Sequence, residues 1–135
     1  MLDQSKTYAY DSRKINAGDA FICLPKGEVY IEEALMKGAT EVIHLDRQAF
    51  ALNANAYFSD PTKRVKLVGI TGINGKTSVA TFTEQLLKKM GHKVLVIGTI
   101  NSQLTTPESW DILKKIKDHV DNGGTHVVLE VSSHG

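Results

Sequence analysis

Apolar and polar residues follow one another along the first 64 residues in short blocks that predict strands and helices in turn. The blocks predict a buried strand over residues 20–24, a helix over 30–37 and a strand over 41–45. The helix depends on Ile31, Ala34 and Leu35, which recur at helical spacing. Residues 46–58 have no clear period and are compatible with a helix. The turn residues of Ser59–Thr62 close this part of the chain.

The remaining residues have a clearer period. Strands are predicted over 65–70, 94–97 and 126–131, separated by helices over 76–90 and from about residue 105 to Gly123. One face of the first helix carries Val79, Phe82, Leu86, Leu87 and Met90, and one face of the second carries Trp110, Leu113, Ile116 and Val120. Thr105, followed by Pro107 and Glu108, is typical of a helix start. This alternation predicts a parallel sheet with right-handed crossovers.

The two patterns meet in the turn Ser59–Thr62, where we place a domain boundary. It divides the chain into a domain of residues 1–64 and a domain of residues 65–135. The length of 135 residues suits one average domain or two small ones that share a surface. A hydrophobic content of 41% is ordinary for a globular protein and argues against disorder. The expected fold class is therefore α/β.

The composition limits the cellular locations and the binding partners that we expect for the chain. No run reaches the roughly 18 apolar residues of a membrane span, and the N-terminus lacks the pattern of a signal peptide. A net charge of +1 disfavours nucleic acid as the main partner. The single cysteine, Cys23, lies in an apolar run and is interpreted as a buried structural thiol rather than a nucleophile. A reducing, cytoplasmic location is expected.

The segment between the strand 65–70 and the next helix has the marks of a phosphate-binding loop. Gly72 and Gly75 allow the backbone to turn with its N–H groups inward, and the helix N-terminus adds positive potential. Lys76 supplies a cation for the β- and γ-phosphates, and the Thr77 hydroxyl is a candidate ligand of Mg²⁺. Ile70 stands where the common G-x-x-x-x-G-K-[ST] pattern has its first glycine. The alternative interpretation is an ordinary turn with a solvated lysine.

An acidic residue, Glu130, follows the apolar run Val127–Leu129 near the end of the strand predicted over 126–131. In phosphate-loop enzymes such a carboxylate holds Mg²⁺ directly or through water. Ser132, Ser133 and His134 follow at the carboxyl edge of the sheet, where ligand sites of α/β proteins form. Taken alone, these three residues fit a simple turn better than a ligand site. The other histidines, among them His44, are given no chemistry.

Together these segments resemble the Mur ligase family. The phosphate loop of the family reads T-G-T-N-G-K-T, and Thr71–Thr77 reads T-G-I-N-G-K-T. Leu104–Glu108 and Glu130–Gly135, which read L-T-T-P-E and E-V-S-S-H-G, are similar to the branch that adds a diamino acid to UDP-N-acetylmuramoyl-L-alanyl-D-glutamate. Asp11–Arg13 and Gly18–Phe21 are similar to the UDP-binding domain of the family. The resemblance covers nearly the whole chain.

The resemblance implies a small N-terminal α/β UDP-binding domain followed by the first part of a parallel-sheet P-loop ATPase domain. It implies a nucleotide site formed by Gly72, Ile73, Asn74, Gly75, Lys76, Thr77 and Ser78. Lys76 and Glu130 would be the catalytic residues, and the metal ligands would be Thr77, Glu130 and His134. Ser12 would contact the uridine nucleotide, and Thr105, Thr106 and Ser132 the muramoyl-dipeptide. Between Gly27 and Tyr30 the chain departs from the family, because only Glu28 and Val29 remain there.

The implied reaction is ATP-dependent amide formation through an acyl phosphate, with ATP and Mg²⁺ as cofactors. The implied substrates are UDP-N-acetylmuramoyl-dipeptide and a diamino acid, with meso-2,6-diaminopimelate preferred over lysine. Members of the family are longer and have three domains, so residues 1–135 alone are expected to be inactive. The alternatives are another Mur or folylpolyglutamate-type ligase and a non-catalytic nucleotide-binding module. A P-loop kinase would need an acceptor site and a lid, and the sequence offers neither.

Overall fold

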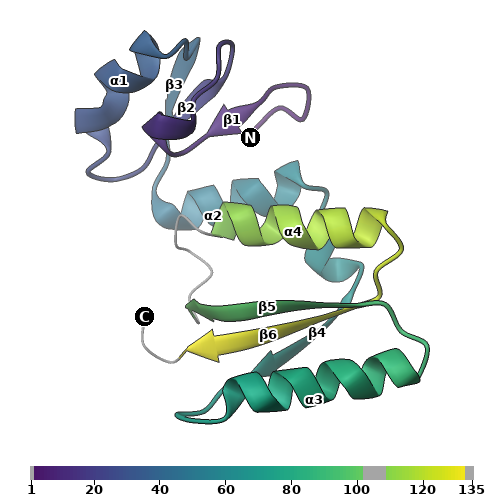
Figure 1. Cartoon of the computed structure of the whole chain (residues 1–135). Coiled ribbons are helices and arrows are strands. Elements are labelled where there is room, and N and C mark those ends of the chain that lie inside the picture. Colours follow the sequence, from purple (N-terminus) through teal and green to yellow (C-terminus); the bar gives the residue numbers. More distant parts are fainter. Residues whose placement is uncertain (1, 102–108, 133–135) are drawn as a thin grey trace.

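Two three-stranded parallel sheets follow one another along the chain (Figure 1). The computed structural model describes residues 2–101 and 109–132. The first sheet has the order β1 (Tyr8–Ala9), β2 (Ala20–Cys23), β3 (Glu41–His44). The second has the order β4 (Lys66–Ile70), β6 (His126–Ser132), β5 (Val94–Asn101). The predicted α/β class and the parallel sheet of the second part are confirmed.

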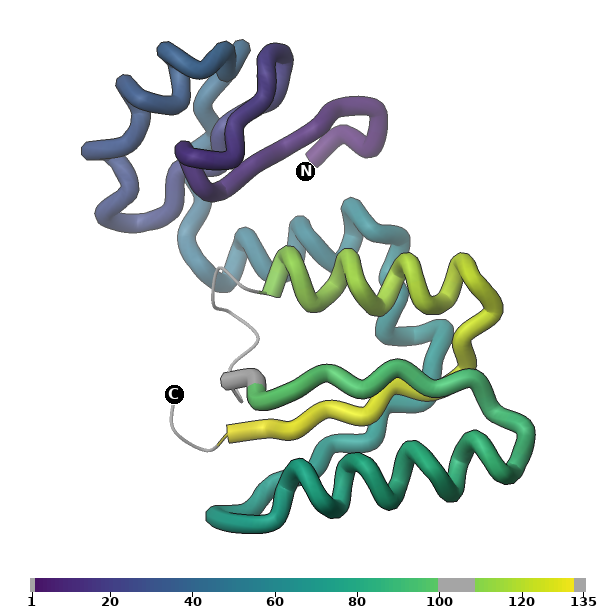
Figure 2. Tube along the Cα trace, in the orientation of Figure 1, coloured from purple at the N-terminus to yellow at the C-terminus, as the bar shows by residue number. Residues whose placement is uncertain are grey.

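Four α-helices lie among the described residues: α1 (Ile31–Met36), α2 (Arg47–Tyr57), α3 (Lys76–Lys89) and α4 (Ser109–Asp121). In Figure 1, α3 covers one face of the second sheet, while α2 and α4 lie side by side between its other face and the first sheet. The tube in Figure 2 shows the same layers. The segment 46–58, which has no clear period in the sequence, contains α2. The helix start expected at Thr105–Glu108 lies outside the described residues.

The alternation of side chains along β2 divides the core of the first part into two clusters. Phe21 and Cys23 pack on one face with Ala34 of α1. Ile22 and Leu24 point to the other face, where they meet α2 and α4. Successive side chains of a strand point to opposite faces, so the continuous apolar run of β2 is needed to fill both. The sheet is therefore covered by helices on both sides.

The central strand β6 of the second sheet divides its core in the same way. Val127 and Leu129 pack against Ile116 of α4. Val128 points to the opposite face and packs against Ala80 of α3. This parity also fixes the direction of the residues that follow in β6, because the side-chain period of a strand is two.

The apolar stripe predicted along the first helix of this part does not form the contact with the sheet. Val79, Phe82, Leu86 and Met90 are each about half exposed or more, and Phe82 is 62% exposed. Ala80, only 1% exposed, and the partly buried Leu87 make the contact instead. The prediction that Leu87 shares a face with the other four residues was therefore wrong, because Leu87 and Ala80 face the strands while the other four face away. The stripe predicted on α4 does face inward.

Aromatic side chains from both parts of the chain interlock between the two sheets. Trp110 of α4 stacks on Phe50 of α2, with ring centroids 5.7 Å apart and planes 8° apart. Tyr57 and Phe58 contact the same indole ring at 5.0 and 4.8 Å. The helix α2 therefore packs on α4, which follows the predicted domain boundary at residues 59–62 in the sequence. The domain boundary itself stays a prediction. None of the described helices is long and apolar enough to cross a membrane.

Replacement of Phe50, which is fully buried, by alanine should lower the free energy of unfolding by about 3–5 kcal/mol because it leaves a cavity beneath Trp110. The matched control is Leu52→Ala on the exposed side of the same helix, where Leu52 is 68% exposed, and its effect should stay within about 0.5 kcal/mol. Urea titrations followed by circular dichroism measure both. Equal effects of the two changes would contradict this packing.

A buried histidine, His126, is the first residue of β6 and lies at the amino-terminal ends of the strands of the second sheet. The His126 ring lies 4.2 Å from that of His92, between ring centroids, and Thr125 Oγ1 is 2.8 Å from its Nδ1. Burial, and then the charges of His92 and Lys66, hold the pKa of His126 below its ordinary value of 6.5. The folded protein therefore resists protonation here more than the unfolded chain does.

The free energy of unfolding should consequently fall as the pH drops below about 6.5, because the unfolded chain takes up this proton first. His126→Gln should flatten that part of the pH profile, because the glutamine side chain takes up no proton in this range. Thermal unfolding between pH 8 and pH 5 measures the difference. A pH profile that is unchanged in His126→Gln would show that the histidine does not carry the effect.

Candidate functional site

The turn between β4 and α3 has the backbone of an anion-binding loop. Gly72 and Gly75 adopt φ angles of 142° and 81°, in the region that favours glycine. Gly75 is the residue before α3, and no side chain caps that helix. The first N–H groups of α3 therefore have no side-chain acceptor, and the positive end of the helix dipole faces the loop. Such a terminus can receive phosphate oxygens.

A hydrogen bond joins the start of this helix to the end of β6. The Thr77 hydroxyl donates to Glu130 Oε1 at 2.7 Å. Glu130 follows Val128 by two residues and so points to the face that α3 covers, where Thr77 occupies the first turn of the helix. The register pairs Glu130 with Ile70, the last residue of β4. Two residues 53 positions apart therefore meet at the carboxyl edge of the sheet.

The pair of oxygens has the chemistry of a Mg²⁺ site. Hydroxyl and carboxylate oxygens are the ligands that this hard cation prefers. The Glu130 side chain is only 6% exposed, but its second oxygen faces Gly98 of β5: an added Cβ on Gly98 would lie 3.9 Å from Oε2. A longer side chain at Gly98 would occupy that space. The residues present therefore fit a Mg²⁺ ion.

The other residues of the predicted nucleotide site surround the helix start. Lys76 is half-buried, and no carboxylate of the described residues lies within 4.0 Å of its ammonium group. Asn74 and Ser78 are exposed, and Ile73 is 95% exposed. The loop is therefore open to solvent, and a cation beside free helix N–H groups is available to an incoming anion.

The predicted substrate residues divide into those that the structure describes and those that it does not. Ser132 ends β6 and pairs in register with Asn101 of β5, at the same edge of the sheet as Glu130. Thr105, Thr106 and His134 lie outside the described residues. Their roles stay predictions.

Ser12, predicted to contact uridine, lies in a separate hollow on the first part of the chain. It is 4% exposed, and its hydroxyl donates to Glu33 Oε2 at 3.2 Å. The hollow has a volume of about 480 Å³ and is walled by the turn Leu24–Gly27 and by Arg13. A bidentate ion pair with Arg13 lowers the pKa of Asp11, so this carboxylate stays ionised. The hollow thus offers both charged and apolar groups to a ligand.

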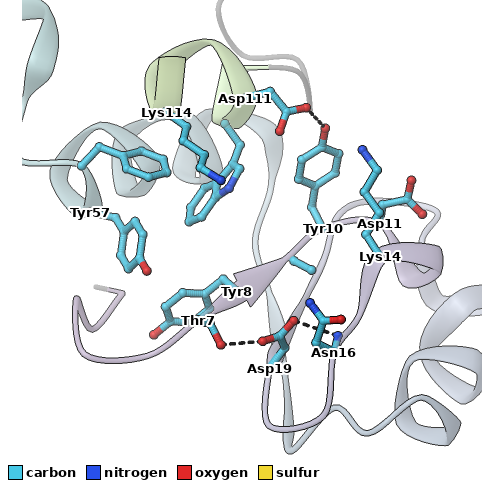
Figure 3. Close-up of a pocket in the computed structure, with 13 residues that line it drawn as sticks. Thr7, Tyr8, Tyr10, Asp11, Lys14, Asn16, Asp19, Tyr57, Asp111 and Lys114 are labelled. Atoms are coloured by element: carbon cyan, nitrogen blue, oxygen red, sulfur yellow. Dashed lines mark hydrogen bonds between the residues drawn. The ribbon is translucent and has the colours of Figure 1, made fainter. Parts of the chain in front are cut away.

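A second hollow, of about 330 Å³, lies between the first sheet and α4 (Figure 3). Tyr10 reaches across it, and its hydroxyl donates to Asp111 Oδ2 at 2.6 Å. Lys14 and Lys114 line it from opposite sides. Sequence reasoning missed this hollow, because its walls come from segments about 100 residues apart that carry no shared motif.

Three comparisons with known proteins find similar proteins among the Mur ligases. Residues 70–135 match the Mur ligase middle domain. The UDP-N-acetylmuramoyl-L-alanyl-D-glutamate–2,6-diaminopimelate ligases of Clostridium perfringens and Solibacter usitatus are 36% and 38% identical to the chain over 93% of its length. The chain spans 32% and 31% of those two relatives. A solved structure of MurF ligase from Thermotoga maritima in complex with ADP matches the whole chain with a TM-score of 0.59 at 20% identity, covering 34% of that protein.

A parallel sheet whose first strand runs through a glycine-rich turn into a helix defines the class of α/β proteins with the architecture of nucleotide-binding folds. Within that class, the matched domain and the relatives are decisive. The chain belongs to the Mur ligase family and resembles the N-terminal portion of its MurE members. The MurF structure adds the likeness of the fold.

Proposed function

We propose that these residues form the substrate-binding and phosphate-binding parts of an ATP-dependent amide ligase. The enzyme adds a diamino acid, meso-2,6-diaminopimelate, to UDP-N-acetylmuramoyl-L-alanyl-D-glutamate in the synthesis of peptidoglycan precursors. The activity for which the relatives are named supports this substrate pair. The observation that carries the proposal is the hydrogen bond between Thr77 and Glu130 beside an uncapped helix start.

Each residue of this edge has a defined task in the proposed site. Lys76 and the N–H groups of Gly72–Gly75 hold the β- and γ-phosphates of ATP and neutralise their charge. Thr77 and Glu130 hold Mg²⁺, which when bound withdraws charge from the phosphate oxygens. These positive charges reduce the electrostatic repulsion between the substrate carboxylate and the γ-phosphate of ATP. The protein acts by positioning and by charge neutralisation.

The chemistry that follows takes place on the substrates. The γ-phosphoryl group of ATP is transferred to the side-chain carboxylate of D-glutamate, which gives an acyl phosphate and ADP. The amine of the diamino acid then attacks the acyl carbon, and phosphate leaves. Ser12 would bind the uridine part, and Thr105, Thr106 and Ser132 the muramoyl-dipeptide. His134 would contribute to a second metal site.

Lys76→Ala should weaken binding of MgATP about 10- to 100-fold, since a charged hydrogen bond contributes about 1.5–3 kcal/mol. Lys89→Ala, on the exposed C-terminal turn of the same helix, is the matched control and should bind like the wild type. Isothermal titration calorimetry with and without Mg²⁺ measures both affinities. Equal affinities of the two variants would remove the phosphate loop from the proposal.

Glu130→Gln should remove the part of ATP affinity that depends on Mg²⁺ and leave the metal-free affinity nearly unchanged. The amide keeps the size of the side chain and its hydrogen bond to Thr77, but it loses the negative charge that attracts the cation. Titrations of Mg²⁺ at fixed ATP measure this dependence. A variant that keeps the full Mg²⁺ effect would show that Glu130 is not a metal residue.

Residues 1–135 alone should form no amide, because the relatives that carry the named activity are about three times as long. The assay supplies ATP, UDP-N-acetylmuramoyl-L-alanyl-D-glutamate and diaminopimelate, and follows the tripeptide product by mass spectrometry. Product formation by these residues would contradict the proposed division of tasks.

A further inference from the structure

Three metal-binding side chains of different kinds converge on the first sheet, away from the phosphate loop. The Cys23 sulfur, a carboxylate oxygen of Glu28 and an imidazole nitrogen of His44 all lie within 4.8 Å of one another. Cys23 is buried, whereas Glu28 and His44 are exposed. Thiolate, imidazole and carboxylate are the three side-chain ligands that proteins use for Zn²⁺.

The backbone of the first sheet brings two of these side chains together. Cys23 of β2 and His44 of β3 are register partners in a parallel pair. Their side chains therefore share a face, the one on which Phe21 and Val42 pack against α1. At the end of both strands the apolar packing stops, and the imidazole is left beside the thiol at the border of the core.

The turn after β2 supplies the third side chain. The Gly27 N–H donates to the Leu24 carbonyl at 2.8 Å, which folds the chain back over Cys23. A Cβ on Gly27 would lie 2.8 Å from that carbonyl oxygen and 3.5 Å from the Cys23 sulfur, so only glycine allows this close approach. Glu28 follows directly. The turn at Gly27 therefore places Glu28, the first residue of the short helix Glu28–Tyr30, beside the thiol.

The charges and distances suit a divalent cation. A thiolate and a carboxylate together carry two negative charges, which a Zn²⁺ ion would balance, and the neutral imidazole adds a third ligand. Tetrahedral Zn²⁺ sites place their ligand atoms about 3.3–3.8 Å apart. Because Glu28 and His44 are at the surface, rotation of these two side chains can close the remaining distance. The thiol proton would be released to solvent on binding.

We propose that Cys23, Glu28 and His44 form a Zn²⁺ site, with a fourth position left for water or another ligand. Leu24 and Gly27, which belong to the turn over the site, also line the hollow that contains Ser12. A bound ion would therefore hold one wall of that hollow in place. The proposal does not depend on ATP binding, because the three residues lie in the first part of the chain, away from the phosphate loop.

Titration of the 135-residue chain with Co²⁺, followed by Zn²⁺, tests the site. The chain has one cysteine, so a thiolate-to-cobalt charge-transfer band in the ultraviolet reports Cys23 alone. We expect this band to appear with Co²⁺, to disappear when Zn²⁺ displaces it, and to be absent in Cys23→Ser. Zn²⁺ should also raise the melting temperature of the wild type, since a ligand that binds only the native state stabilises it.

Two exposed ligands allow a test that does not disturb the core. Glu28→Gln and His44→Gln should each lower Co²⁺ affinity at least about tenfold, because even residues that only support metal ligands contribute that much. Glu32→Gln and His92→Gln are the matched controls and should keep the band and the affinity. The proposal is overturned if the wild type gives no thiolate band, or if Glu28→Gln and His44→Gln bind as tightly as their controls.

Discussion

The contact between Thr77 and Glu130 depends on the two-residue period of one central strand. Val127 and Leu129 of β6 must face α4, so Val128 and Glu130 must face α3. A shift of one residue in the register of β6 would turn the carboxylate toward α4 and turn Val127 and Leu129 toward α3. The apolar packing of the second sheet therefore also directs Glu130 toward the start of α3. The same contacts stabilise the fold and set the geometry of the site.

Much of this edge can be predicted from the sequence, because each part has a local signature. The apolar blocks of β4 and β6, the glycine-rich turn and the helix period of α3 are all short-range patterns. The parallel order of the strands follows from their alternation with helices. The place of Glu130 beside the loop then needs only the rule that carboxyl ends of parallel strands share an edge. The roles of the individual residues stay predictions.

The features that escaped prediction all depend on contacts between distant segments. The sequence pattern of α3 shows a stripe of large apolar residues, but it does not show which face of the helix contacts the sheet. Ala80 makes that contact, and Phe82 does not. The bond between Tyr10 and Asp111 joins segments without a common motif. His44 carried no signal in the sequence, because its nearness to Cys23 follows from the pairing of β2 with β3.

The position of Trp110 has a consequence for observing how the two sheets move. It is the single tryptophan of the chain, and its indole ring lies among Phe50, Tyr57 and Phe58 between the sheets. Its neighbours come from the first part of the chain, while Trp110 itself belongs to the helix that lies on the second sheet. Tryptophan fluorescence from this one residue therefore reports any change in the packing between the two sheets.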